Sequence, residues 1–95
     1  MNFTQYKGDF GSSLQGHFDQ AMTYQEVASV IGEATNNENI DNKVNWEWVL
    51  KFDDGVIATI YNYKDNYRGK DAKRVWHIGG EDRVVVERVN ELFKV

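Results

Sequence analysis

A short segment of the chain combines cations with aromatic rings, the two side-chain types that a planar anionic ligand needs. Residues 64–74 hold five cations against two carboxylates, whereas the rest of the chain holds six cations against thirteen. The cations are Lys64, Arg68, Lys70, Lys73 and Arg74, and the rings around them belong to Tyr61, Tyr63, Tyr67, Trp76 and His77. Because rings stack on a base and cations pair with phosphate, this segment predicts a nucleotide-like ligand. The alternative is a solvated loop above a packed hairpin.

The motif Trp76-His77-Ile78-Gly79-Gly80 joins an expected strand to an expected helix. Free N–H groups at the start of a helix attract anions, and glycines let a ligand approach the backbone closely. The spacing matches neither the phosphate-loop nor the dinucleotide fingerprint, so a sharp strand-to-helix turn is the alternative. The predicted ligand-binding residues are Tyr61, Tyr63, Arg68, Arg74, Trp76, His77, Gly79 and Gly80.

The two histidines, His17 and His77, lie far apart in the sequence, and neither belongs to an HxxxH or HExxH pattern. We therefore expect no metal site. His77 could pair with Asp82 or Asp65 for acid–base chemistry, but no nucleophile motif accompanies it. We predict a protein with no catalytic residues and no cofactor, and keep a small hydrolase-type enzyme using His77 as the least favoured alternative.

Carboxylates dominate the rest of the chain, including the segment that we expect to form a hairpin. Glu47, Asp53 and Asp54 are the predicted protein-binding residues, because an acidic surface is attracted to a basic groove on a partner. The alternative is that these charges serve only solubility.

Hydrophobic patterns predict one helix and one hairpin in the middle of the chain. Thr23 and Glu26 have capping-box spacing ahead of an apolar stripe, which predicts a helix over 23–31 that ends at Gly32. Strict alternation over 43–52 predicts a half-buried strand with one face made by Val44, Trp46, Trp48, Leu50 and Phe52. Residues 53–55 then form a turn, and 56–64 form the return strand.

The flanking segments complete a single domain over residues 1–95. We expect a third strand over 73–78, broken by Gly79 and Gly80, and a helix over 81–93. Residues 33–42 and 65–72 are polar loops, and residues 1–22 form an arm with one or two short strands. The predicted fold class is α+β: an antiparallel sheet of three to five strands with two helices packed on one face.

Composition excludes several classes of protein. The chain has 95 residues, no cysteine and a net charge of −4, which argues against disulfide frameworks and sequence-specific nucleic-acid binding. No apolar run has the ~20 residues that a membrane span requires, and the N-terminus lacks the pattern of a signal peptide. We expect a cytoplasmic protein with no membrane partner.

The run from Ser12 to Gly80 resembles a family of small, mostly uncharacterised proteins of phages and prophages. The most specific blocks are Ala58-Thr59-Ile60-Tyr61-Asn62-Tyr63-Lys64 and Trp76-His77-Ile78-Gly79-Gly80. Further matches are Ser13-Leu14-Gln15-Gly16, Thr23-Tyr24-Gln25-Glu26, Ile31-Gly32-Glu33, Trp46-Glu47-Trp48 and Asp54-Gly55-Val56. Ala34 stands where the family has proline, and the segment between the two blocks is shorter here. The resemblance implies a small protein that works in the cytoplasm of a host cell.

These sequence features leave three functions open. The first is a non-enzymatic, phage-encoded antagonist of a host defence system, which binds a host protein or complex stoichiometrically, as anti-CRISPR proteins do. The second is a sponge that sequesters a nucleotide second messenger in the basic, aromatic pocket. The third is the enzyme that uses His77. A homodimer is also expected, because so many aromatic side chains in a small domain can leave apolar patches exposed.

Overall fold

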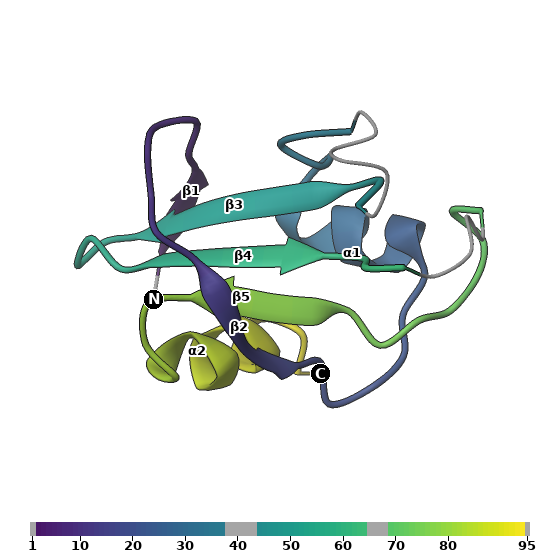
Figure 1. The fold of residues 1–95 in the computed structure, drawn as a ribbon. Coiled ribbons are helices and arrows are strands. Elements are labelled where there is room, and N and C mark those ends of the chain that lie inside the picture. Colours follow the sequence, from purple (N-terminus) through teal and green to yellow (C-terminus); the bar gives the residue numbers. More distant parts are fainter. Residues whose placement is uncertain (1, 38–43, 65–68, 95) are drawn as a thin grey trace.

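A computed structural model describes residues 2–37, 44–64 and 69–94 of the chain. Seven elements follow one another: β1 (Phe3–Gln5), β2 (Ser13–His17), α1 (Tyr24–Ile31), β3 (Glu47–Phe52), β4 (Ile57–Tyr61), β5 (His77–Gly80) and α2 (Val84–Leu92). The strands form one five-stranded sheet in the order β1-β3-β4-β5-β2, and every neighbouring pair is antiparallel. The predicted α+β class is confirmed (Figure 1).

The centre of the sheet is the predicted hairpin of β3 and β4. Its turn lies at Asp53-Asp54-Gly55, and Gly55 has a φ of +89°, which suits glycine. Phe52 and Val56 close the turn, since the Phe52 amide donates to the Val56 carbonyl at 2.8 Å. The hairpin is shorter than the predicted spans 43–52 and 56–64, because the buried Asn62 side chain bends the chain ahead of β3. Its Oδ1 accepts from the amides of Asn45 and Trp46.

The N-terminal arm supplies both edges of the sheet. β1 pairs with β3 on one side and β2 pairs with β5 on the other. The connecting residues 6–12, here called the strap, therefore pass across a face of the sheet, in front of β3 and β4 in Figure 1. Ser12 anchors the strap, with its Oγ 3.1 Å from Thr59 Oγ1 on β4.

Helix α1 begins as its sequence predicts. The Thr23 side chain accepts from the Glu26 amide, and the Glu26 side chain accepts from the Thr23 amide, which forms a complete capping box. Gly32 follows the helix with a φ of +90°. Helix α2 begins at Val84 rather than at residue 81, and its N-cap is Arg83. The side chain of Asp82, just before the helix, accepts from the Val84 amide at 2.9 Å.

One face of the sheet, here called the covered face, carries the core. It consists of Trp48, Leu50, Phe52, Ala58, Ile60 and Ile78, all of them buried. These side chains form one hydrophobic cluster with residues of both helices, including Val27 of α1 and Val85 and Val89 of α2. The helices therefore lie on the same side of the sheet. The opposite side, here called the open face, is crossed by the strap and carries the alternate residues of the strands.

Two further predictions about the strands are wrong. The third strand covers His77–Gly80 instead of 73–78, so the two glycines continue the strand instead of breaking it. Val44 does not share a face with Trp48, because it precedes the bend that Asn62 holds and lines a hollow of the open face.

Candidate functional site

The aromatic half of the predicted site divides between the two faces of the sheet. Trp76 is fully buried in the core, where its Nε1 donates to the Met22 carbonyl at 3.0 Å. Its ring packs edge-on against Trp48, with centroids 5.2 Å apart. His77, the next residue, points to the other side because successive residues of a strand alternate. The prediction that Trp76 contacts a ligand is therefore wrong.

Arg74 also lies on the covered side, where it is 4% exposed. Its guanidinium lies between two indole rings, 5.2 Å from the centroid of Trp46 and 5.1 Å from that of Trp76. Its Nη2 donates to the Gly69 carbonyl at 2.9 Å. These contacts make Arg74 part of the packing beneath the helices, and the prediction that it binds a ligand is wrong.

The remaining predicted cations do not form one patch. Lys70 lies over the ring of Tyr24, at 4.4 Å, and Lys73 pairs with Glu26 at 3.4 Å, so both lie against α1. Among the described cations of the predicted segment, Lys64 alone lies beside a predicted ligand residue of the open face: its Nζ is 5.4 Å from the centroid of Tyr63. Arg68 lies outside the described residues. The predicted basic surface is thus reduced to Lys64 within the part of the chain that the structure describes.

The two glycines do not form a helix-start anion site, and that prediction is also wrong. Both lie within β5, which is hydrogen-bonded to β4 on one side and β2 on the other. A Cβ on Gly79 would lie 2.5 Å from Thr59 Oγ1 and 2.6 Å from Ser12 Oγ. A Cβ on Gly80 would lie 2.9 Å from a methyl group of Val85. Close packing on both faces therefore accounts for the two glycines.

Three predicted ligand residues do converge, in a hollow of about 590 Å³ on the open face, here called the aromatic hollow. It is lined by Ser12, Ser13, Leu14, Val44, Glu47, Thr59, Tyr61, Tyr63 and His77. The Tyr61 and His77 rings stack with centroids 5.4 Å apart and an interplanar angle of 24°. Tyr63 meets His77 edge-on at 5.9 Å. The hollow therefore offers aromatic rings, hydroxyl groups and one carboxylate to a ligand.

The sheet register places three of these side chains in a row with His17, which does not line the hollow. Glu47 on β3 is opposite Tyr61 on β4, which is opposite His77 on β5, which is opposite His17 on β2. The two imidazole rings are 4.7 Å apart. The row is rigid because each member stands on a paired strand, so the spacing of its groups does not depend on a loop.

Burial shapes the ionisation of this row. It raises the pKa of the half-buried Glu47 carboxyl, and the hydrogen bond from Asn36 Nδ2 to Oε1, at 3.0 Å, opposes that rise. Burial also raises the pKa of the Tyr61 hydroxyl, and the negative charge of Glu47 adds to the effect. Glu47, predicted from sequence as a protein-binding residue, is thus a member of the aromatic hollow.

Sequence reasoning missed several residues of this hollow. Thr59, Tyr61 and Tyr63 alternate along the chain, so the period-two pattern alone could have placed Thr59 beside the two tyrosines. Ser12, Ser13 and Leu14 come from the strap and β2, and no local pattern shows that this segment crosses the sheet. His17 reaches His77 only through the pairing of β2 with β5.

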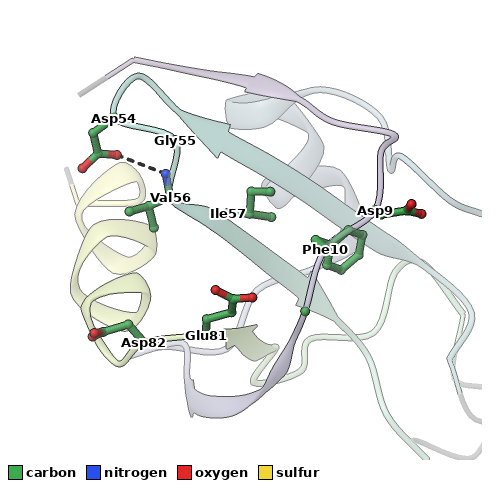
Figure 2. Close-up of a pocket in the computed structure, with 9 residues that line it drawn as sticks. Asp9, Phe10, Asp54, Gly55, Val56, Ile57, Glu81 and Asp82 are labelled. Carbon is green, nitrogen blue, oxygen red and sulfur yellow. Dashed lines mark hydrogen bonds between the residues drawn. The ribbon is translucent and has the colours of Figure 1, made fainter.

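A second hollow, of about 390 Å³, lies on the other side of the strap and is here called the acidic hollow. It is lined by Asp9, Phe10, Gly11, Asp54, Gly55, Val56, Ile57, Glu81 and Asp82. Figure 2 shows Glu81 and Ile57 pointing into it, whereas the carboxylates of Asp9, Asp54 and Asp82 point away from its centre.

Two of the predicted protein-binding residues belong to the hairpin turn beside the acidic hollow. Asp54 makes a two-pronged ion pair with Arg88 of α2, at 2.8 and 2.7 Å, which holds the pKa of its carboxyl below the ordinary value. Asp53 is exposed, and its amide donates to the Asn2 carbonyl at 3.1 Å. The three acidic residues predicted to bind a protein therefore occupy two different places.

The described residues contain no group of three or more His, Asp or Glu side chains placed to hold a metal ion, and no helix long and apolar enough to cross a membrane. Asp82, one of two acids considered as a partner for His77, instead accepts from the Val84 amide at the start of α2 and lines the acidic hollow. The other, Asp65, lies outside the described residues.

Comparison of the chain with protein-family models, with curated proteins and with solved structures gives no match.

Proposed function

We propose that this protein is a non-enzymatic antagonist, encoded by a phage, that sequesters a nucleotide signal of a host defence system in the aromatic hollow. The observation that carries the proposal is the convergence of Tyr61, Tyr63 and His77 around one hollow on the open face. Rings on the face opposite the helices leave aromatic surface available to a flat ligand, and stacking on a base is worth about 1–3 kcal/mol per ring.

The size and lining of the hollow suit a small ligand. Its volume of about 590 Å³ falls within the range of about 300–1,000 Å³ that is typical of small-molecule sites. The exposed hydroxyl groups of Ser12 and Ser13 can donate or accept, so they can satisfy a ribose or a base edge. Lys64, next to Tyr63, supplies a positive charge for a phosphate.

Sequestration accounts for antagonism without catalysis. A protein that binds a signal and does not convert it lowers the free signal concentration in proportion to its own amount. The resemblance to phage proteins supports the setting, which is the cytoplasm of an infected host cell. The protein then works only when its concentration approaches that of the signal.

The test is calorimetric titration with a panel of linear and cyclic nucleotides. We expect binding of at least one nucleotide at micromolar concentration, recovery of the nucleotide unchanged, and a loss of at least tenfold in affinity in Tyr63→Ala. Phe10→Ala is the matched control: the two rings are 39% and 37% exposed on the same face, but Phe10 lines the acidic hollow. No binding across the panel, or equal losses in the two variants, would refute the proposal, and conversion of the nucleotide would favour the enzyme.

The acidic hollow supports a second candidate, direct binding of a host defence protein or complex. Asp9 and Glu81 are exposed carboxylates around the exposed ring of Phe10, a combination that suits a basic side chain with an apolar stem. Reversal of both charges, by Asp9→Lys and Glu81→Lys, should abolish the protection of the phage from host defence in an infection assay if this candidate is right. If only Tyr63→Ala abolishes protection, the sponge is right.

The predicted homodimer remains a separate expectation. β1 and β2 form the two edges of the sheet, and Leu14 on β2 is 53% exposed. A register shift between Leu14 and Gly16 interrupts the β2 edge, and irregular edges resist strand-to-strand association. Analytical ultracentrifugation of the free and nucleotide-bound protein measures the oligomeric state directly.

A further inference from the structure

Among the described residues that line the aromatic hollow, Glu47 is the one side chain that can only accept hydrogen bonds when it is ionised. The hydroxyl and imidazole groups around it can each donate as well as accept, and no described lysine or arginine lines the hollow. Within the same part of the chain, only Asn36 donates to the Glu47 carboxylate, and it does so to Oε1. Oε2 is therefore available to donors of a ligand.

The position of this carboxylate is fixed before any ligand arrives. The Glu47 amide donates to the Asn36 carbonyl at 2.8 Å, and the Asn36 amide donates to the Glu47 carbonyl at 2.9 Å. The Asn36 side chain then binds Oε1, so the same residue holds both the backbone and the side chain of Glu47. An acceptor that is already ordered loses little conformational entropy when a ligand binds, and this favours its use in recognition.

We propose that Glu47 selects the base of the nucleotide, an inference that rests on the proposed function. The selected base is a purine with two adjacent N–H donors on its edge, as in guanine. N1–H and the 2-amino group of guanine can meet the two oxygens of one carboxylate in parallel. Adenine presents one donor beside an acceptor. The accepting ring nitrogen would face a carboxylate oxygen, which is also an acceptor, so the two atoms would repel each other. The aromatic rings of the hollow bind the flat surface of either base, so Glu47 decides between them.

The register supports this assignment because Glu47 is the direct cross-strand neighbour of Tyr61. Directly opposite side chains on one face of a sheet have Cβ atoms about 4.5–5.5 Å apart, close enough for one base to contact both. A base in contact with the Tyr61 ring can therefore present its edge to Glu47 without movement of the backbone.

The experiment compares guanosine, inosine and adenosine 5′-monophosphates by calorimetry. A hydrogen bond to a charged group is worth about 1.5–3 kcal/mol, so each matched donor should change affinity by roughly tenfold or more. We expect guanosine monophosphate to bind most tightly and inosine monophosphate, which lacks the 2-amino group, to bind more weakly. Adenosine monophosphate should bind at least tenfold more weakly than guanosine monophosphate.

Glu47→Gln sharpens the test because its amide has one acceptor and one donor. This matches the edge of adenine, so the variant should lose the preference for guanosine monophosphate and bind adenosine monophosphate as well or better. Glu81→Gln is the matched control, since it removes an equal charge from the same face in the acidic hollow; it should keep the preference for guanosine.

The outcomes separate the two proposals. If both nucleotides bind but Glu47→Gln leaves their affinity ratio unchanged, Glu47 does not read the base and this inference fails while the sponge survives. If neither nucleotide nor any other of the panel binds, the proposed function fails and this inference fails with it. Burial of the Glu47 carboxyl disfavours its charge, so the neutral glutamine should fold.

Discussion

Neighbouring residues of one sequence motif lie on opposite faces of the sheet and have different roles there. On the covered face, Trp76 and Arg74 pack into an aromatic cluster beneath the helices, where neither has surface to offer a ligand. On the open face, His77 joins Tyr61 and Tyr63 around a hollow on the side away from both described helices. The comparison shows that a chemically suggestive run in a strand divides into a structural half and a half available for binding. Successive side chains of a β-strand point to opposite faces of the sheet, and this alternation determines the face on which each residue lies.

The largest expected difference between the faces comes from removal of one ring from each. Trp76→Ala should lower the free energy of unfolding by about 3–5 kcal/mol, because it leaves a large cavity in the core and removes the donor to the Met22 carbonyl. Tyr63→Ala should lower it by less than about 1 kcal/mol, since its ring is exposed. Urea denaturation measures both. Similar losses would show that the open-face ring is also structural.

The strap makes the next sharpest contrast, because it brings the Ser12 hydroxyl group close to Gly79. Gly79→Ala should cost about 1–3 kcal/mol, since the new methyl group would overlap the side chains of Thr59 and Ser12. Gly69→Ala is the control: a Cβ added there would meet no heavy atom of the described residues within 4 Å, so stability should stay equal or rise. Thermal melts of the two variants compare them. If Gly79→Ala is as stable as the wild type, the strap does not press on the sheet.

The contrast between the faces also explains which parts of the molecule can be predicted from sequence. The capping box at Thr23 and the turn at Gly55 depend on residues close together in the chain, and both predictions are confirmed. The sequence predicts a break at the glycines of β5, because glycine is normally unfavourable in a strand. What outweighs that preference is close contact with Ser12 and Val85, and contacts between distant segments leave no local pattern in the sequence.

The candidate site follows the same division. The period-two pattern from Thr59 to Tyr63, which continues beyond the end of β4 at Tyr61, places Tyr61 and Tyr63 on one side, so that part of the aromatic hollow can be predicted. The sequence assigns Glu47 to a separate acidic surface, since nothing pairs it with Tyr61 until the hairpin register is known. For His17 the sequence raises only the question of a metal ligand, and its contact with His77 depends on the strap.

A smaller effect is expected at the start of α1, on the covered side. Thr23→Ala removes the side-chain acceptor of the Glu26 amide and should lower stability by about 1 kcal/mol, the usual value for the loss of such a cap. Ser29→Ala, in the same helix, removes an exposed hydroxyl that donates to the Glu26 carbonyl, and should change stability little. Nucleotide affinity should be the same in both variants, because neither residue lines the aromatic hollow. A change in affinity in either variant would mean that the two faces are coupled.

The smallest effect concerns the ion pair that joins the β3–β4 turn to α2. Arg88 on α2 binds both oxygens of Asp54, and its hydrogen bonds lower the pKa of the Asp54 carboxyl from the ordinary value of 3.8. A carboxyl with a lowered pKa in the folded state adds stability above its unfolded pKa, and this contribution is lost as the pH falls through the folded value. Asp54→Asn should therefore be less stable than the wild type at neutral pH, and the difference should shrink as the pH falls below 3.8 and vanish below the folded pKa.

The neighbouring Asp53 provides the control for that pH dependence. It is exposed in the same turn, and its carboxyl has no hydrogen bond or ion pair with the described residues. Asp53→Asn should therefore follow the wild-type stability curve across the whole acid range, as measured by urea denaturation at successive pH values. Because the pair is at the surface, salt should weaken the Asp54 effect as well. If the free energy of unfolding differs between Asp54→Asn and the wild type by the same amount at every pH, the charge of Asp54 is not what stabilises the fold. Asp54 would then act through the shape of the turn, where it accepts from the Val56 amide.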